Sequence, residues 1–270
     1  MNDTTNQRRA AFPWKDGKPP HLPCAPGDVG PIVLLPGDPA RVGLAAKQLP
    51  NARDLGQRRE YRMASATVDG VGVTLCSTGI GGPSTEIALV ELANLGAKIA
   101  IRIGGMGAIA PGLPLGGMLI VNDAIGDTGA ARVYGAKGPV NASPQIVEAL
   151  ANAAKADGTA HRVGRVATTD SYYRGQGRPL FGDAAGPSPE DDPIAKFAAQ
   201  GAVGCDMETE TILTVGAALG LQAGAILAVH GDRTTDRWLE DYEPAQEAVV
   251  RIALRAALDL MSSNPNGDSP

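Results

Sequence analysis

The stretch IVLLPGDPAR, residues 32–41, joins a short aliphatic run to a glycine turn and the start of a helical segment. The stretch VGVTLCSTGIGGPST, residues 71–85, has the same design. In each, a strand is expected to enter a tight turn and then a helix, which leaves backbone N–H groups unpaired at the positive end of the helix dipole. Glycine lets the backbone approach a ligand closely. A third stretch, IAIRIGG at residues 99–105, places Arg102 near the end of a predicted strand. Together the three predict a site for phosphate or a similar anion.

Apolar runs and helical patterns alternate along the rest of the chain. Strands are predicted at residues 32–35, 63–68, 71–76, 98–103, 118–122, 161–166, 203–207 and 223–229. Helices are predicted at residues 86–95, 143–156, 209–219 and 245–261, with Ser143 as an N-cap. The pair Asp69-Gly70 is typical of a hairpin turn. This alternation indicates a single α/β domain around a buried sheet.

The boundaries of that domain follow from composition. Residues 1–20 are polar and predict a flexible arm, residues 21–262 form the domain, and residues 263–270 predict a disordered tail. Residues 182–193 are rich in Gly, Pro and Asp, which is typical of a surface loop or a lid.

Charge and composition narrow the classes of function. The net charge of −5 argues against general nucleic-acid binding, which needs a basic face. No apolar run approaches the ~20 residues of a membrane span, so no membrane partner is expected. The cysteines at 24, 76 and 205 have no metal-binding spacing and form no even disulfide set, which favours a reducing cytoplasm.

A family resemblance rests on motifs that occur in order along most of the chain. These are residues 21–22, 36–41, 59–61, 76–85, 102–104, 107–109, 172–178, 206–208 and 232–234. They resemble the nucleoside phosphorylase-I family, and most closely its pyrimidine branch. The resemblance implies a single domain with a mixed central sheet flanked by helices. It also implies reversible phosphorolysis of uridine or a related nucleoside to ribose 1-phosphate and free base, with inorganic phosphate as co-substrate and no other cofactor.

The resemblance also implies roles for individual residues. Phosphate is expected at Gly37, Arg41, Arg102 and Gly105, with Arg59 contributed by a neighbouring subunit. Ribose is expected at Met207 and Glu208, with His21 reaching the 5′-hydroxyl from the neighbour. The base is expected at Tyr172, Gln176, Arg178, His230, Asp232 and Arg233, with Arg233 supporting Arg178. Arg178, Gln176, Arg102 and Glu208 are the expected catalytic residues.

These roles agree with side-chain chemistry. An arginine fork binds oxyanions bidentately and stays charged. A carboxylate accepts from both hydroxyls of a diol, and an amide both donates and accepts. Glu60, Ile80 and Ser84 match a monovalent-cation site, such as one for K⁺, at the dimer interface of some relatives. The shared site implies a homo-oligomer with a dimer as its minimum unit and a hexamer expected.

Two departures from the family pattern leave alternatives open. Gly105 stands where relatives carry a hydroxyl. If a hydroxyl is all that is missing, Gly105→Thr is expected to lower the Michaelis constant for phosphate, whereas no change would mean that the pocket is rebuilt around Met106. His230 and Gly231 replace an apolar pair, and Asp232 stands where purine phosphorylases place an acid. The alternatives are a purine nucleoside phosphorylase, a nucleosidase that uses water on a modified base, and a nucleoside- or base-binding protein without catalysis.

Overall fold

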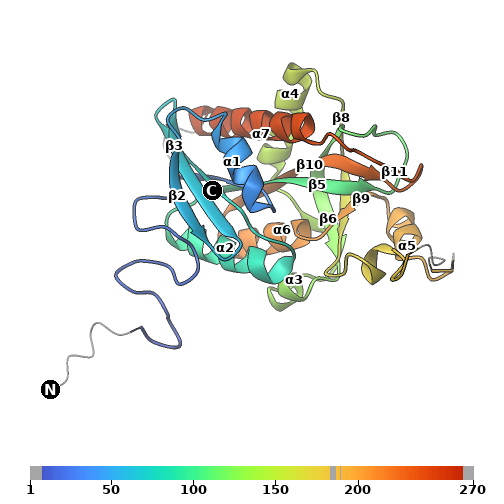
Figure 1. The fold of residues 1–270 in the computed structure, drawn as a ribbon, viewed down its shortest axis with the longest axis horizontal. Helices are drawn as coiled ribbons and strands as arrows, with labels where there is room; N and C mark the ends of the chain where they lie inside the picture. The colour runs from blue at the N-terminus through green and yellow to red at the C-terminus, as the bar shows by residue number, and fades with distance from the viewer. Residues whose placement is uncertain (1–7, 183–186, 189, 264–270) are drawn as a thin grey trace.

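The computed structural model describes residues 8–182, 187–188 and 190–263, which form one α/β domain around a mixed sheet (Figure 1). The strands are β1 (Ile32–Leu35), β2 (Arg53–Arg58), β3 (Tyr61–Val68), β4 (Val71–Cys76), β5 (Ile99–Ala108), β6 (Met118–Gly126), β7 (Val140–Asn141), β8 (His161–Thr168), β9 (Ala202–Asp206), β10 (Gln222–Asp232) and β11 (Arg237–Trp238). Their order is β11-β10-β6-β8-β9-β5-β1-β4-β3-β2, with β7 paired to β6.

Part of this sheet closes on itself. Strand β10 is hydrogen-bonded to β6 and also to β5, so β10, β6, β8, β9 and β5 form a ring. Strands β1, β4, β3 and β2 extend from β5 as an open sheet. The predicted mixed sheet is therefore confirmed, with both parallel and antiparallel pairs.

Strand β5 divides between the ring and the open sheet. One edge pairs with β10 along nearly its whole length. On the other edge, residues 99–102 pair with β1, whereas Gly107 and Ala108 pair with β9. Residues 103–106 thus lie at a fork where β5 has lost one neighbour and not yet gained the next. Ligands commonly bind at such divisions of α/β sheets.

Helices cover both faces of the whole sheet (Figure 1). On one face lie α1 (Pro39–Ala46), α4 (Pro144–Asp157) and α7 (Glu243–Ser263). On the other lie α2 (Gly82–Asn94), α3 (Gly129–Val133) and α6 (Thr209–Ala218). The short helix α5 (Pro193–Ala199) packs on β9, and η1 (Arg174–Gln176) is a single 3₁₀ turn.

The core forms two layers, one on each side of the sheet. Strand β1 shows why, because its side chains alternate between the faces. Ile32 and Leu34 pack into the layer under α1, α4 and α7, whereas Val33 and Leu35 pack into the layer above α2 and α6. All four residues are buried, as expected of a strand covered on both faces.

Most predicted elements are confirmed, with shifts at their ends. Asp69 and Gly70 both have positive φ, at 49° and 83°, as the predicted hairpin turn requires. Ser143 precedes α4 but does not cap it, because its hydroxyl accepts a hydrogen bond from the backbone N–H of Ala223 instead. Helix α7 continues to Ser263, so that residue is helical rather than part of the predicted tail. Residues 1–7 of the expected arm, 183–186 and 189 of the expected lid, and 264–270 of the tail lie outside the described residues.

No helix in the described part of the chain is both long enough and apolar enough to cross a bilayer.

Candidate active site

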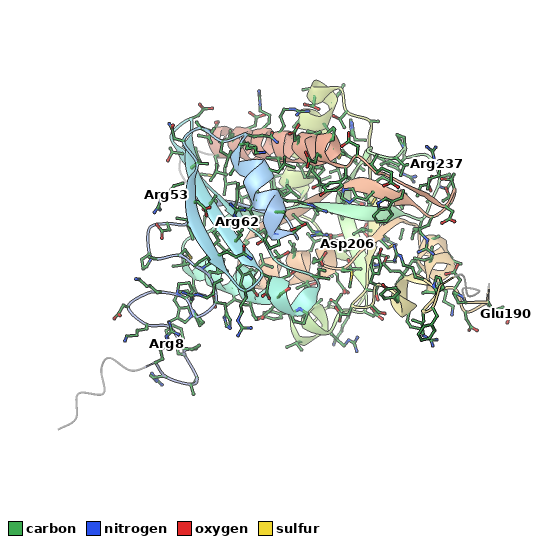
Figure 2. The ribbon with its side chains drawn as sticks, viewed as in Figure 1. Arg8, Arg53, Arg62, Glu190, Asp206 and Arg237 are labelled. Atoms are coloured by element: carbon green, nitrogen blue, oxygen red, sulfur yellow. The ribbon has the colours of Figure 1, made fainter. Side chains whose placement is uncertain are left out.

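A cavity of about 670 Å³ opens beside the fork in β5. The segments that follow β1, β4, β8 and β9 line it, together with the end of β10 and the turn η1. Figure 2 shows Asp206, one of the lining residues, in the middle of the molecule, whereas Arg8, Arg53 and Arg237 lie on its outside. The cavity therefore reaches into the interior of the domain.

The two glycine turns form one end of this cavity. The backbone N–H groups of Thr78 and Gly79 donate to the carbonyl oxygens of Pro36 and Gly37, both at 2.9 Å, so the turns are fixed against each other. The carboxylate of Asp38 caps α1 by accepting from the Ala40 N–H at 2.8 Å. The sequence motif thus builds a rigid rim.

Two arginines at this end have donors without a protein partner. Among the described residues, Arg41 Nε and Arg102 Nη1 are buried side-chain atoms with no hydrogen bond. Burial lowers the pKa of Arg41, and the nearby charge of Arg102 lowers it further. Unsatisfied buried donors are costly and therefore rare in native proteins. An anion between the two guanidinium groups would satisfy both donors and offset their repulsion.

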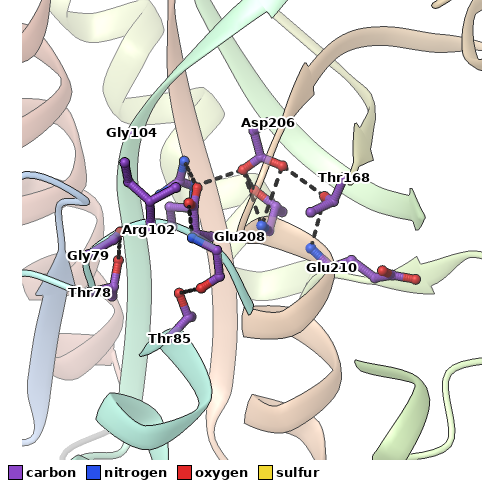
Figure 3. A network of polar contacts seen from close by, with 12 residues as sticks. Thr78, Gly79, Thr85, Arg102, Gly104, Thr168, Asp206, Glu208 and Glu210 are labelled. Carbon is purple, nitrogen blue, oxygen red and sulfur yellow. Dashed lines mark hydrogen bonds and ion pairs between the residues drawn. The ribbon is translucent and has the colours of Figure 1, made fainter. Parts of the chain in front are cut away.

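Arg102 is held by two carboxylates (Figure 3). Its Nε donates to Asp206 Oδ2 at 2.9 Å, and its Nη2 lies 2.7 Å from Glu208 Oε2. Burial acts to lower the pKa of Arg102, but the charges of Glu208 and Asp206 outweigh burial and raise it. The guanidinium is therefore a fixed positive charge with one free N–H edge.

The two carboxylates have different surroundings. Asp206 accepts from Thr168 Oγ1 at 2.8 Å and from the N–H of Thr209 at 3.1 Å, so it anchors the start of α6 (Figure 3). Glu208 does not cap this helix and instead accepts from the Gly81 N–H at 2.6 Å. Burial raises the pKa of Glu208, whereas Arg102 acts to lower it. Asp206 is structural in this arrangement, and Glu208 faces the cavity.

An amide and a guanidinium form the other end of the cavity. Arg178 stacks on Tyr172, with its Cζ 3.8 Å from the ring centroid, and its Nη1 donates to the Tyr172 carbonyl oxygen at 2.9 Å. The same Nη1 donates to Gln176 Oε1. Gln176 Oε1 also accepts from the thiol of Cys205, whose pKa burial raises to about 11. The Gln176 amide oxygen is thus occupied, which leaves its NH₂ group to a ligand.

Two successive glycines at the fork make room for side chains from elsewhere. A Cβ atom on Gly104 would lie 2.8 Å from Arg102 Cζ. A Cβ atom on Gly105 would lie 2.5 Å from Cε1 of the His230 ring, with Nδ1 closer still. The expectation that Gly105→Thr simply adds a missing hydroxyl is therefore wrong, because the imidazole of His230 already occupies that space.

The structure brings most of the predicted site residues together. Those that line the cavity are Gly37, Arg41, Glu60, Ile80, Arg102, Gly105, Tyr172, Gln176, Arg178, Met207, Glu208 and His230. Those that do not are His21, Arg59, Ser84, Asp232 and Arg233.

Asp232 and Arg233 differ most from expectation. The Asp232 carboxylate accepts from the Thr234 N–H and hydroxyl and from the Thr235 hydroxyl, at 2.7–2.9 Å. It therefore closes the turn after β10 instead of reaching the cavity. Arg233 Nη1 donates to the Gln176 carbonyl oxygen at 2.8 Å, so it supports Gln176 rather than Arg178.

The other three predicted residues outside the cavity lie in the N-terminal segment, in the turn between β2 and β3, and on α2. His21 Nδ1 lies 2.6 Å from Glu91 Oε1 on α2, and the Arg59 side chain is exposed in the turn between β2 and β3. Ser84 donates to the carbonyl oxygen of Ile80 at 3.2 Å, and Ile80 is 79% exposed at the cavity rim. Among the described residues, no group of three His, Cys, Asp or Glu side chains is placed to hold a metal ion.

Sequence reasoning missed several lining residues, among them Cys205 and Trp238. Cys205 lies inside an apolar strand and carries no distinguishing pattern. Trp238 lies on β11, and Gly231 leaves room for its ring, since a Cβ there would meet Trp238 Cε3 at 3.0 Å. The pairing of Gly231 with Trp238 could have indicated that the indole lies in the site, but this pairing is known only from the assembled sheet.

A ring of strands, a cavity at the fork and two unpaired arginine donors define a class of α/β protein whose cavity suits an anion beside a small polar molecule. The sequence comparisons are consistent with this class. The model of the phosphorylase superfamily matches residues 31–260, and this chain belongs to that family.

Individual relatives extend over nearly the whole chain. A uridine phosphorylase of Thermococcus kodakarensis is 38% identical over 242 residues, covering 89% of this chain and 87% of its own. A guanosine phosphorylase of Halorubrum lacusprofundi is 29% identical, covering 90% and 99%. The crystal structure of purine nucleoside phosphorylase from Toxoplasma gondii in complex with immucillin-H matches with a TM-score of 0.80 at 31% identity, covering 93% of this chain and 99% of its own.

Proposed function

We propose that this protein is a pentosyltransferase that catalyses the reversible phosphorolysis of uridine or a related pyrimidine nucleoside. Phosphate attacks C1′ of the ribose, the bond from C1′ to the base breaks, and ribose 1-phosphate and free base are released. The observation that carries the proposal is the division of one cavity. Unpaired arginine donors lie at one end, the Gln176–Arg178 pair lies at the other, and Glu208 also lines the wall.

The arginine end suits the nucleophile. Arg41 and Arg102 each offer a buried N–H without a protein partner. The charge of Arg102 is fixed before substrate arrives, because Asp206 and Glu208 hold its guanidinium in place. Preorganised charge of this kind stabilises a transition state without further reorganisation. It favours phosphate over water as the nucleophile, because water would leave two positive groups without an anion.

Glu208 suits the sugar between the two ends. Burial raises the pKa of Glu208, and its pairing with Arg102 and the hydrogen bond from the Gly81 N–H both act in the opposite direction. An ionised carboxylate can accept from the 2′- and 3′-hydroxyls of ribose. Met207 lines the same wall and offers an apolar contact.

The Gln176–Arg178 end suits the base. The Gln176 NH₂ group can donate to a base carbonyl, and Arg178 can stabilise the negative charge that develops on the departing pyrimidine. A purine phosphorylase reaction through Asp232 is less well supported. Its carboxylate is engaged with Thr234 and Thr235, and the pKa of Asp232 is lowered by the hydrogen bonds from these residues, which opposes its use as an acid.

We infer that the working unit is a homo-oligomer, at least a dimer. His21 and Arg59 do not line the cavity of their own chain, so their expected roles require a neighbour. The exposed Ile80 at the cavity rim and the adjacent Glu60 would lie at that interface, where a K⁺ ion would bind with Ser84. A hexamer and a cytoplasmic location remain predictions of the family resemblance.

The test is release of free base from uridine, thymidine, cytidine, inosine and guanosine, each with and without inorganic phosphate. Phosphate-dependent release of uracil with formation of ribose 1-phosphate is the expected result. Release that is equal without phosphate would indicate a hydrolase. Binding of uridine without any release would indicate a binding protein.

A further inference from the structure

His230 lies at the arginine end of the cavity rather than at the base end. Its ring occupies the space in front of Gly105, and both residues line the cavity. The ring centroid lies 5.7 Å from that of Tyr242, and Arg41 in turn lies over Tyr242 with its Cζ 5.8 Å from the ring centroid. The charges of Arg41 and Arg102 both act on His230. These contacts place an imidazole beside the two unpaired arginine donors.

The hydrogen bonds of Gln246 determine which imidazole nitrogen carries the proton. Gln246 is buried in the first turns of α7. Its Nε2 lies 3.3 Å from the carbonyl oxygen of Gly104 and 2.7 Å from His230 Nε2. A carbonyl oxygen only accepts, so this Gln246 atom is a donor to both neighbours. His230 Nε2 is then an acceptor, and the proton of the neutral ring is on Nδ1.

The neutral state of this ring has a clear physical cause. Burial and the charges of Arg41 and Arg102 lower the pKa of His230 to about 4. The ring is thus an uncharged donor at neutral pH. Its Nδ1 has no hydrogen-bond partner among the described residues, and with Cε1 it is the part of the ring nearest to Gly105.

We propose that the Nδ1–H of His230 donates a hydrogen bond to an oxygen of the phosphate held between Arg41 and Arg102, from the space that a side chain at position 105 would fill. This inference rests on the proposed function, which assigns phosphate to these arginines. It makes His230 a phosphate-binding residue, Gly105 the residue that admits it, and Gln246 the residue that orients it.

The proton assignment can be tested without any variant that alters the site. The chain has three histidines, at 21, 161 and 230, so the imidazole ¹⁵N signals of the whole protein are few. The signals of His230 are expected to show a protonated Nδ1 and a bare Nε2, and titration with inorganic phosphate is expected to shift the Nδ1 signal. A proton on Nε2, or no shift at phosphate saturation, would overturn the proposal.

The energetic contribution is tested by calorimetric titration of inorganic phosphate in the absence of nucleoside. His230→Phe keeps a ring but removes the donor, and the Kd is expected to rise roughly tenfold to a hundredfold, the cost of one hydrogen bond to a charged group. His230→Asn keeps an N–H near the Nδ1 position and is expected to retain most of the affinity. His161→Phe, outside the cavity, is the matched control and is expected to bind as the unmodified protein does.

Two outcomes would contradict the proposal: no binding of phosphate by the unmodified protein, or equal affinity in His230→Phe. Failure of the proposed function gives a different pattern. A protein that binds phosphate through His230 but leaves uridine intact would keep this inference and refute phosphorolysis. Phosphate-dependent release of uracil together with unchanged phosphate affinity in His230→Phe would support phosphorolysis and refute the role of His230.

Discussion

The imidazole of His230 lies where the side chain of residue 105 would otherwise be, with Cε1 only 2.5 Å from the position of a Cβ atom on Gly105. The two positions are therefore coupled, and a substitution at one changes the requirement at the other.

Gly105→Thr is expected to raise the Michaelis constant for phosphate by roughly tenfold or more, because the new side chain displaces the His230 ring and its donor. In Gly105→Thr combined with His230→Ala, the threonine has room and its hydroxyl can replace the lost donor. Steady-state kinetics with varied phosphate compares the two. An improvement in the single variant would show that His230 moves aside without cost.

Arg178→Ala is expected to reduce turnover of uridine far more than turnover of a nucleoside with an activated leaving group. The guanidinium is stacked on Tyr172 and bonded to Gln176, so it is positioned to stabilise a base that departs as an anion. A better leaving group needs less of this help. Single-turnover rates on both substrates make the comparison, and equal losses would assign Arg178 to binding alone.

Asp206→Asn is expected to destabilise the fold by about 1.5–3 kcal/mol, because it removes one of the two carboxylates that pair with the buried Arg102 and weakens the start of α6. Urea unfolding measures the change. Asp54→Asn is the matched control, since Asp54 pairs with Arg62 at an exposed site and should contribute less than about 1 kcal/mol. Similar losses in both variants would mean that the buried pair has no special role in stability.

Acid is expected to destabilise the protein partly through His230. Its pKa is about 4 in the folded state, below its ordinary value of 6.5, because burial and Arg41 disfavour the charged form. The unfolded chain therefore binds a proton first, and stability that is present above pH 6.5 is lost as the pH falls toward 4. Free energies of unfolding at pH 7.5 and pH 5 should fall less in His230→Phe than in the unmodified protein. Equal losses would mean that the ring is already protonated in the fold.

Mixing two inactive variants tests the shared site. Arg59→Ala and Arg102→Ala are each expected to lose most activity. If Arg59 serves a neighbour, a mixed dimer contains one intact site, and equal mixing after subunit exchange should restore about a quarter of the activity. Recovery is measured as uracil release before and after exchange. A mixture of Arg102→Ala with Arg102→Gln is the control, because neither variant can supply the missing Arg102. If the mixture of Arg59→Ala and Arg102→Ala shows no recovery, Arg59 acts in the site of its own subunit.

Sequence alone predicted the framework of this site well for a physical reason. Aliphatic runs such as residues 32–35 can be buried on both faces only in a covered sheet, and glycine turns after such runs expose backbone N–H groups. Strand β2 escaped prediction, because its sequence RDLGQR is polar and mostly exposed at the edge of the sheet.

Side-chain direction was the part that sequence could not provide. Asp232 ends β10 and Arg233 follows it, yet the Asp232 carboxylate closes a turn and the Arg233 side chain supports Gln176. In the sequence, Gly105 indicated the loss of a hydroxyl that would contact phosphate. The pairing of β5 with β10 places the His230 ring beside Gly105, which the sequence did not indicate. Such compensation joins residues more than a hundred positions apart, so it becomes visible only when the strands are assembled.

The position of Trp238 makes its fluorescence a potential reporter of ligand binding in the cavity. The chain has two tryptophans, and Trp238 lines the cavity while Trp14 stacks with Phe12 near the N-terminus. A nucleobase that enters the cavity would approach one indole and leave the other in its surroundings. Once Trp14 is replaced by phenylalanine, the remaining tryptophan fluorescence originates at the site itself, so occupancy can be followed in real time without a label on either molecule.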